Sequence, residues 1–242
     1  MDSHNHENCV IHTEDLTKIY DGGAFPVRAV NDVHLHIEKG EFTTLVGPSG
    51  SGKTTLLNLI GGLDQPTQGK VWVKDVDIST LSKSQLIDFR LHNIGFVFQA
   101  YNLIPVLTAR ENIEFVMLLQ KRSKAERKKR VFQLLREIGM EDKINHRPAQ
   151  LSGGQQQRVA VARALASKPQ FVLADEPTAN LDSKTAKNLL DTMVKLNEEE
   201  HITFIFSTHD QRVMDRARRV ITLVDGAIAS DELKEEQHII IG

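Results

Sequence analysis

The residues best suited to chemistry begin with a glycine-rich segment, Gly47-Pro48-Ser49-Gly50-Ser51-Gly52-Lys53-Thr54. It matches the pattern G-x-x-x-x-G-K-[ST], in which glycines let backbone N–H groups turn toward a bound phosphate. Lys53 is expected to reach the β- and γ-phosphates of a nucleotide, and the Thr54 hydroxyl is expected to bind Mg²⁺. An apolar stretch precedes the segment and a helical pattern follows it, as a phosphate loop requires. The alternative is a chance glycine turn before a helix, which this context disfavours.

A second candidate is a pair of adjacent acids, Asp175 and Glu176, that follows the apolar stretch 171–174. Asp175 is suited to Mg²⁺, through a water molecule, because hard cations prefer oxygen ligands. Glu176 is then free to polarise a water for attack on the γ-phosphate. Acids also cap ordinary strands, but together with the phosphate loop the pair indicates a catalytic site.

Two further side chains follow predicted strands directly. Gln99 comes after 94–98, and His209 comes after 203–207. Both are expected at the carboxyl edge of a parallel sheet, where α/β folds bind ligands. An amide can contact the metal or the water, and an imidazole can bond the γ-phosphate. Either residue alone is typical of a loop, whereas their shared placement favours a site.

The segment Leu151-Ser152-Gly153-Gly154-Gln155 precedes a helical pattern at 156–166. Ser152 is an N-cap candidate, and the glycines expose backbone N–H groups, so this is a second helix start able to bind an anion. One nucleotide needs one phosphate loop. We therefore expect a two-fold dimer in which each chain offers this segment to its partner's nucleotide. A structural glycine turn is the alternative.

The elements that must position these residues alternate along the chain. Apolar stretches of strand length alternate with helical patterns, which predicts an α/β fold with a parallel sheet and helices on both faces. Between about 99 and 167 helical patterns replace strand patterns. The first dozen residues are expected to be a lead-in without regular structure. The expected strands are 33–37, 42–46, 71–73, 94–98, 171–174, 203–207 and 220–224, and the expected helices are 54–60, 109–120, 125–138, 156–166, 184–197 and 211–217.

Composition excludes several classes of protein. The chain has 242 residues, of which 40% are hydrophobic, enough for a real core. A net charge of −2 argues against a general nucleic-acid binder, so no nucleic-acid partner is expected. A single cysteine, Cys9, rules out an internal disulfide and fits a reducing compartment. No apolar run is long enough to cross a bilayer and no signal peptide is evident, so any membrane part is expected in another chain.

A basic cluster lies near the start of the predicted helix 125–138. A membrane-facing role is conceivable, because anionic headgroups attract such segments. A solvated helix face is the favoured interpretation of such a run. The cluster consists of Lys121, Arg122, Lys124, Arg127, Lys128, Lys129 and Arg130.

Taken together, these motifs resemble the nucleotide-binding subunits of ATP-binding cassette (ABC) transporters. The resemblance implies a P-loop NTPase fold: a RecA-like parallel sheet core, an antiparallel β subdomain and an inserted α-helical subdomain. It implies one cassette over about 10–235, with the core at 10–98 and 168–230 and the helical signature subdomain at 99–167. Residues 1–9 and 236–242 are expected to be flexible tails.

The resemblance also implies roles for individual residues. Tyr20 is expected to stack on adenine, and Asp182 is similar to the D-loop residue that crosses a dimer interface. Gln99 resembles the Q-loop residue and His209 the switch histidine, so the resemblance implies Glu176, His209 and Gln99 in catalysis and Thr54, Gln99 and Asp175 near Mg²⁺. The nucleotide contacts that it implies are Tyr20, Gly47, Pro48, Ser49, Gly50, Ser51, Gly52, Lys53, Thr54, Thr55, Ser152, Gly153, Gly154, Gln155 and Asp182.

A narrower resemblance, to the lipoprotein-releasing and macrolide-exporter ATPase group, rests on 96–112, 148–150 and 174–178. It implies an ATPase using ATP and Mg²⁺, a second copy of the chain, and an integral membrane permease with a large extracytoplasmic domain. The chain would then sit peripherally on the cytoplasmic face of the inner membrane, with 103–112 as the docking segment. The work it would drive is lipoprotein release, macrolide or peptide efflux, or mechanotransmission. The alternatives are a cassette regulator of cell-wall enzymes in division, or a soluble cassette ATPase of DNA repair or translation.

Overall fold

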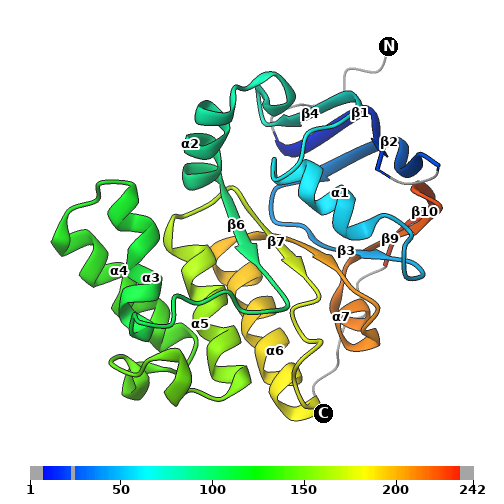
Figure 1. Ribbon diagram of the computed structural model, residues 1–242. Helices are drawn as coiled ribbons and strands as arrows, with labels where there is room; N and C mark the ends of the chain where they lie inside the picture. The colour runs from blue at the N-terminus through cyan, green and yellow to red at the C-terminus, as the bar shows by residue number, and fades with distance from the viewer. Residues whose placement is uncertain (1–7, 23–24, 235–242) are drawn as a thin grey trace.

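The computed structural model describes residues 8–22 and 25–234, and its central element is a six-stranded sheet (Figure 1). The strand order is β10-β9-β3-β8-β7-β6, in which β3, β6, β7, β8 and β9 run parallel and β10 is antiparallel to β9. The bounds of these strands are β3 Phe42–Val46, β6 Ile94–Val97, β7 Phe171–Asp175, β8 Thr203–Ser207, β9 Arg219–Val224 and β10 Ala227–Leu233.

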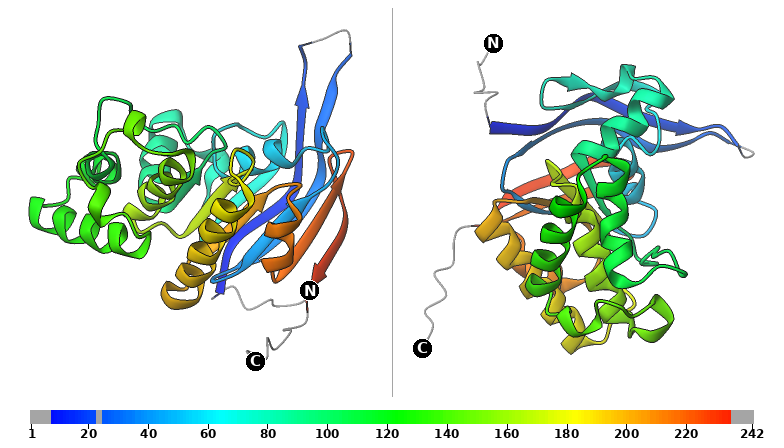
Figure 2. Two further views of the ribbon diagram at one scale, coloured as in Figure 1. Left: turned by 90° about the horizontal axis from the view of Figure 1, so that it is seen from below. Right: turned by 90° about the vertical axis from the view of Figure 1, so that its left-hand side faces the viewer.

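A second sheet is antiparallel, with the strand order β2-β1-β4-β5. Its strands are β1 Cys9–Tyr20, β2 Val27–Glu38, β4 Gln68–Val73 and β5 Val76–Asp77. The two sheets together give the expected parallel core with an antiparallel β subdomain. Figure 2 shows the long β1–β2 hairpin at the opposite end of the molecule from α3 and α4.

The helices are α1 Lys53–Ile60, α2 Lys83–Asn93, α3 Ala109–Leu119, α4 Lys124–Glu137, α5 Gly153–Ala166, α6 Ser183–Glu200 and α7 Gln211–Arg216. Helices α2, α3, α4 and α5 each begin at a capping box, in which Ser or Thr is followed three residues later by Gln or Glu. From 98 to 170 the chain forms helices, 3₁₀ turns and loops but no strand, as the change of pattern predicted.

The parallel sheet is buried on both faces, so its strands are nearly continuous apolar runs. Side chains alternate between the two faces: Phe204 and Phe206 pack with α5 and α6, whereas Ile205 packs with α1 and the antiparallel sheet. The rings of Phe42 and Phe206 lie 4.6 Å apart between centroids. Each such buried Phe stabilises the fold by about 1.5–3 kcal/mol through burial alone.

Four elements were not among the expected strands and helices: β1, β5, α2 and β10. The lead-in expected for the first dozen residues is corrected from Cys9 onward, where β1 begins one residue before the expected start of the cassette. The strand pattern of β1 is interrupted because Asp15 adopts φ +49° and the register to β2 shifts between Thr13 and Leu16. Helix α2 buries a single side chain, Leu86, and so carries almost no apolar periodicity.

At the other end of the chain, β10 extends the sheet through 231–233, beyond the expected end of the core at 230. Of the expected tails, 1–9 and 236–242, the parts 1–7 and 236–242 lie outside the described residues. Within 8–22 and 25–234, none of the helices has the length and apolar character that a bilayer crossing demands.

Candidate active site

The phosphate-loop sequence joins β3 to α1, which is the strand–loop–helix context that the pattern predicted. Gly52 has φ +99°, and a Cβ there would lie 2.1 Å from the Ala29 carbonyl oxygen, so only glycine fits. Gly52 is also the N-cap of α1, and no side chain among the described residues accepts a hydrogen bond from the first N–H groups of this helix. The first N–H groups of α1 are therefore free to bind an anion.

The Lys53 ammonium lies over the loop. Its Nζ donates hydrogen bonds to the carbonyl oxygens of Gly47 at 2.8 Å and Pro48 at 2.9 Å. The Lys53 ammonium, the loop amides and the start of α1 therefore all attract an anion to the same place.

The hydroxyl of Thr54 lies against the carboxylate of Asp175, at 3.1 Å from Oδ1 and 3.2 Å from Oδ2. Thr54 belongs to the first turn of α1, and Asp175 is the last residue of β7. Hydroxyl and carboxylate oxygens are the donors that Mg²⁺ prefers, so this pair fits the ion that the sequence predicted.

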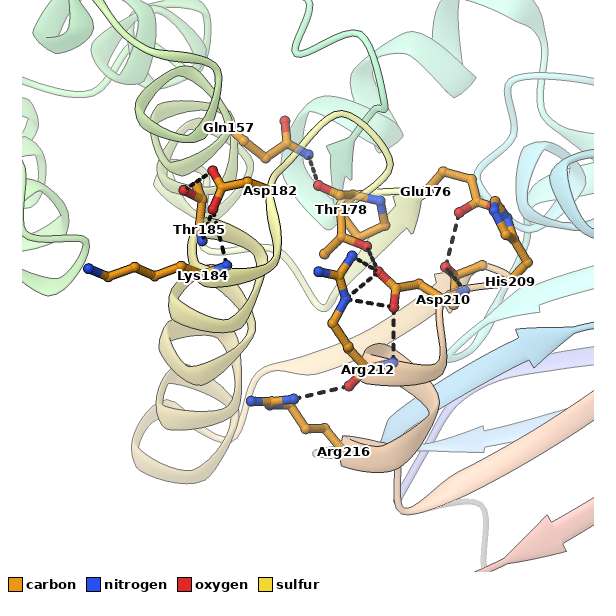
Figure 3. Close-up of polar contacts among 12 residues, drawn as sticks. Gln157, Glu176, Thr178, Asp182, Lys184, Thr185, His209, Asp210, Arg212 and Arg216 are labelled. Atoms are coloured by element: carbon orange, nitrogen blue, oxygen red, sulfur yellow. Dashed lines mark hydrogen bonds and ion pairs between the residues drawn. The ribbon is translucent and has the colours of Figure 1, made fainter.

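Glu176 is held by three contacts, two from the segment that follows β8 and one from the last residue of β8. His209 lies beside it in Figure 3. Oε1 of Glu176 lies 2.7 Å from Nδ1 of His209, and its Oε2 accepts a hydrogen bond of 3.0 Å from the hydroxyl of Thr208. Its N–H donates to the carbonyl of Ser207 at 2.8 Å. Glu176 has φ +45°, a left-handed conformation that costs a non-glycine residue roughly 1–2 kcal/mol. The contacts from β8 and its loop offset that cost and fix the carboxylate.

The phosphate loop, Glu176 and His209 share one cleft of about 710 Å³, whose lining does not include Asp175 or Thr208. The structure therefore brings Gln99, Glu176 and His209 to the phosphate loop, as their placement after parallel strands predicted. The antiparallel sheet adds Ala29 to the wall. The lining consists of Ala29, Gly47, Pro48, Ser49, Gly50, Ser51, Gly52, Lys53, Thr54, Thr55, Gln99, Glu176, Ala179, Ser207 and His209.

Gln99 follows β6 and is tied through its backbone to the segment after Glu176. Its carbonyl oxygen accepts a hydrogen bond of 3.0 Å from Nδ2 of Asn180. The side chain of Gln99 is thus left for the cleft, while its main chain is fixed to a neighbouring loop.

The segment Leu151–Gln155 does not line this cleft. Ser152 is the N-cap of α5, as expected: its hydroxyl accepts from the N–H of Gln155 at 3.3 Å, and Oε1 of Gln155 accepts from the N–H of Ser152 at 2.9 Å. A Cβ on Gly154 would lie 1.9 Å from the methyl carbon of Thr185 on α6, so the helix start packs closely on α6.

Asp182 and Tyr20 also lie outside the lining of the cleft. Asp182 caps α6: it accepts from the N–H groups of Lys184 and Thr185 and from the Thr185 hydroxyl at 2.6 Å. The Tyr20 hydroxyl donates to Oδ2 of Asp64 at 2.8 Å, and desolvation, followed by this bond, raises the pKa of the phenol. Tyr20 is 42% exposed, and the Lys18 ammonium lies over its ring, 4.9 Å from the ring centre.

Three residues of the site had no chemical role in the sequence interpretation: Thr208, Thr178 and Asp210. Thr208 bonds Glu176 directly, and the Thr178 hydroxyl donates to Oδ2 of Asp210 at 2.6 Å. The only signal for them in the sequence was that each lies within two residues of Glu176 or His209.

Known proteins match this chain over most of its length. A family model described as ABC transporter matches residues 30–179. The chain belongs to the ABC transporter ATPases. An uncharacterized ABC transporter ATP-binding protein of Methanocaldococcus jannaschii, MJ0796, is 46% identical over 92% of this chain and 97% of that protein. The lipoprotein-releasing system ATP-binding protein LolD of Idiomarina loihiensis is 40% identical over 93% of this chain and 99% of its own length.

One further relative and one solved structure bear on the architecture of ABC proteins. The macrolide export ATP-binding/permease protein MacB of Brucella melitensis is 43% identical over 95% of this chain, which spans 35% of MacB. The solved structure of the cassette MJ0796, a dimer in a post-hydrolysis state bound to ADP and Pi, has a TM-score of 0.85 and 44% identity and covers 94% of this chain and 100% of that one. The fold of this ABC chain is therefore the P-loop ATPase cassette.

Proposed function

We propose that this ATPase binds Mg²⁺-ATP in the cleft, dimerises around two nucleotides, and uses hydrolysis to drive a membrane partner. The observation that carries the proposal is that one cleft holds the phosphate loop with Lys53 and the glutamate–histidine pair Glu176–His209. A nucleotide's terminal phosphate and the base that would activate water then share one space.

The phosphate loop supplies a positive charge and oriented N–H groups for the phosphates. The ammonium of Lys53 now bonds two neutral carbonyls, and phosphate oxygens are stronger acceptors for a cation. The uncapped start of α1 adds the positive end of a helix dipole. The loop would therefore hold the β- and γ-phosphates and stabilise the charge that develops on them.

Thr54 and Asp175 would hold Mg²⁺, since their oxygens already lie within hydrogen-bonding distance of one another. When bound, the ion neutralises charge on the phosphate oxygens. Gln99 lines the cleft together with Thr54 and would contact the metal or the attacking water.

Glu176 would act as the general base. Its carboxylate accepts the proton of a water molecule while the water oxygen bonds the γ-phosphorus and the bond from phosphorus to the leaving ADP oxygen breaks. Thr208 and His209 hold the two carboxylate oxygens, so the base is oriented before the water arrives. His209 is 77% exposed, which leaves its ring able to reach the γ-phosphate.

A second copy of the chain would complete the site. The capped start of α5, with Ser152 and Gly154, offers backbone N–H groups but does not line the chain's own cleft. The relative MJ0796 was solved as a dimer bound to ADP and Pi, which supports the same arrangement here. Asp182, at the start of α6 beside this segment, would lie at the dimer interface, and Tyr20 would stack on adenine.

A membrane permease would dock on the segment 103–112 and the adjoining α3. Val106 is 68% exposed in that segment, and Leu118 and Leu119 at the end of α3 are 51% and 52% exposed. Exposed apolar side chains on α3 and on the segment that follows Gln99 suit a partner that must sense the nucleotide. The relatives LolD and MacB support lipoprotein release or macrolide efflux as the driven process and a place on the cytoplasmic face of the inner membrane.

The decisive experiment uses Glu176→Gln, which keeps the side chain's size and removes its basicity. With saturating Mg²⁺-ATP this variant is expected to sediment as a dimer and to keep only a small residual rate of ATP hydrolysis, while Glu198→Gln on the exposed side of α6 behaves as the unmodified protein. A Glu176→Gln variant that stays monomeric both alone and with its membrane partner would contradict the dimer, and one that hydrolyses ATP at the full rate would contradict the base.

The membrane partner is tested by purifying the tagged chain from detergent-solubilised membranes of its own cells. A co-purifying permease with a large extracytoplasmic domain is expected, and Val106→Glu should weaken its retention. A division protein in its place would indicate the cell-wall regulator, and no membrane protein at all would indicate a soluble cassette ATPase.

A further inference from the structure

The loops that carry Glu176 and His209 leave the sheet side by side. Strands β7 and β8 are parallel neighbours, with Asp175 paired to Ser207, so Glu176 and Thr208 are the first residues beyond the sheet. The backbone ladder between the two strands ends with the bond from the Glu176 N–H to the Ser207 carbonyl, so contacts of the loops themselves must join them beyond that point. Whatever joins the two loops therefore sets the position of Glu176 relative to His209.

Thr178 and Asp210 make that junction (Figure 3). The hydroxyl of Thr178, two residues after Glu176, donates a 2.6 Å hydrogen bond to Oδ2 of Asp210, the neighbour of His209. Thr178 is fully buried, and the side chain of Asp210 is 14% exposed. Neither residue is part of the wall of the 710 Å³ cleft, so within the described chain they act behind the site.

Asp210 is a fixed anion. Arg212 donates to its Oδ2 at 2.7 Å from Nη2 and to its Oδ1 at 2.9 Å from Nε, and the N–H of Arg212 donates to Oδ1 at 2.9 Å. These bonds from Arg212, together with that from Thr178, lower the pKa of the Asp210 carboxyl to about 2. The carboxylate is thus ionised and immobile, and it can anchor the hydroxyl that reaches it from the other loop.

The Thr178 loop is fixed from its other side by α5. Gln157, a fully buried residue, donates from Nε2 to the carbonyl of Pro177 at 2.9 Å. Pro177, which lies between Glu176 and Thr178, is therefore bonded to α5, the helix whose N-cap is Ser152. The position of α5 and the position of the His209 loop both act on the two residues that follow Glu176.

We propose that Thr178 and Asp210 are positioning residues for hydrolysis: their hydrogen bond clamps the two loops and keeps the Glu176 carboxylate against His209 and Thr208. The inference rests on the proposed function, because it concerns how the base Glu176 is aimed. It assigns no contact with nucleotide to either residue. Loss of the bond should slow turnover and leave nucleotide binding, which depends on the phosphate loop, as it is.

The test compares Thr178→Val with Thr178→Ser. Valine keeps the branched shape of threonine and removes the hydroxyl, whereas serine keeps the hydroxyl and removes a methyl. With Thr178→Val, kcat is expected to fall at least about 10-fold with KM changed by less than about 2-fold, since misplacing a catalytic group by an ångström costs up to about 100-fold. With Thr178→Ser, kcat should stay within about 2-fold of the unmodified enzyme, because the bond persists.

Thr44→Val is the matched control for removing a buried hydroxyl. Thr44 is fully buried on β3, and its hydroxyl has no hydrogen-bond partner, so its loss should leave kcat unchanged. Binding of a fluorescent ATP analogue and the thermal midpoint are measured on every variant. A Thr178→Val protein that folds, binds the analogue and turns over at the full rate would overturn the clamp, and so would a loss of kcat that serine fails to restore.

A second measurement separates this inference from the proposed function. Glu176→Gln and the double variant Glu176→Gln/Thr178→Val are assayed together. If Thr178 acts through Glu176, the double variant is as slow as Glu176→Gln, whereas independent roles would multiply the two losses. Full activity of Glu176→Gln would contradict the role of Glu176 as the general base. A large loss of activity in Glu176→Gln together with unchanged activity in Thr178→Val would contradict only the positioning role of Thr178.

Discussion

The Thr54 hydroxyl and the Asp175 carboxylate meet at 3.1 and 3.2 Å although 121 positions separate the two residues. The contact joins the first turn of α1 to the end of β7 and defines where a hard cation can be held. It also places that cation beside Glu176, the next residue along the chain.

Asp175→Asn should therefore change how hydrolysis depends on Mg²⁺. The amide keeps one oxygen and loses the negative charge, so the Mg²⁺ concentration giving half-maximal activity should rise about 10- to 100-fold. The measurement is a Mg²⁺ titration of ATP turnover, with Asp88→Asn on the exposed side of α2 as the control. An unshifted titration curve would remove Asp175 from the metal site.

His209→Ala should lower kcat while leaving nucleotide affinity near its original value. The imidazole holds Oε1 of Glu176 at 2.7 Å, and a positioned proton-transfer group contributes about 100- to 10,000-fold in rate. Steady-state kinetics and binding of a fluorescent ATP analogue separate the two effects. His34→Ala, on the exposed face of β2, serves as the control, and a kcat that matches this control would show that the pair is unimportant for turnover.

Gly154→Ala should destabilise the fold by overpacking. The added methyl would sit 1.9 Å from Cγ2 of Thr185, and rotating Thr185 away would break its 2.6 Å hydrogen bond to Asp182. Overpacking of this kind costs about 1–3 kcal/mol of unfolding free energy, measurable by urea denaturation. Adding Thr185→Ser removes the clashing methyl and keeps the hydroxyl, so the double variant should regain most of the loss. Equal stability of Gly154→Ala and the unmodified protein would contradict the contact.

The Asp210 carboxyl should make stability depend on acid pH. Its pKa in the folded chain is about 2, below the ordinary value of 3.8, chiefly because of the Arg212 side chain. A lowered pKa stabilises the fold fully above pH 3.8, and this contribution is lost as the pH falls from 3.8 through about 2.

Asp210→Asn should thus be less stable than the unmodified protein at pH 6, and the difference should shrink by pH 3. Urea unfolding at the two pH values gives the comparison, because every other carboxyl titrates alike in both proteins. A difference that stays constant, or grows toward pH 3, would show that Asp210 is not a stabilising anion.

The parts of the site that could be predicted are those governed by repeated backbone geometry. Gln99, Glu176 and His209 each follow a parallel strand, and such strands end at one edge of a sheet, so their meeting followed from the order of the chain. The helix start at Ser152 was predictable because a serine followed three residues later by glutamine is a capping box.

The parts that could not be predicted depend on irregular backbone. The bond between Thr178 and Asp210 lies just beyond Glu176, whose left-handed conformation no local pattern requires of a glutamate. In the same way, the left-handed Asp15 breaks the alternation of β1, and an alternating pattern is what identifies a strand. Both features are stabilised by contacts with distant segments, so the nearby sequence carries little trace of them.

The close packing of Gly154 on Thr185 also limits how this chain can change over generations. A larger residue at the first position is tolerable only after the second has become smaller, so the order in which the two substitutions arise is not free. Among natural descendants the two sites should vary together, with a serine or alanine at the second accompanying any alanine at the first. Correlated variation of this kind would show that the Thr185 methyl group restricts which residues position 154 can accept.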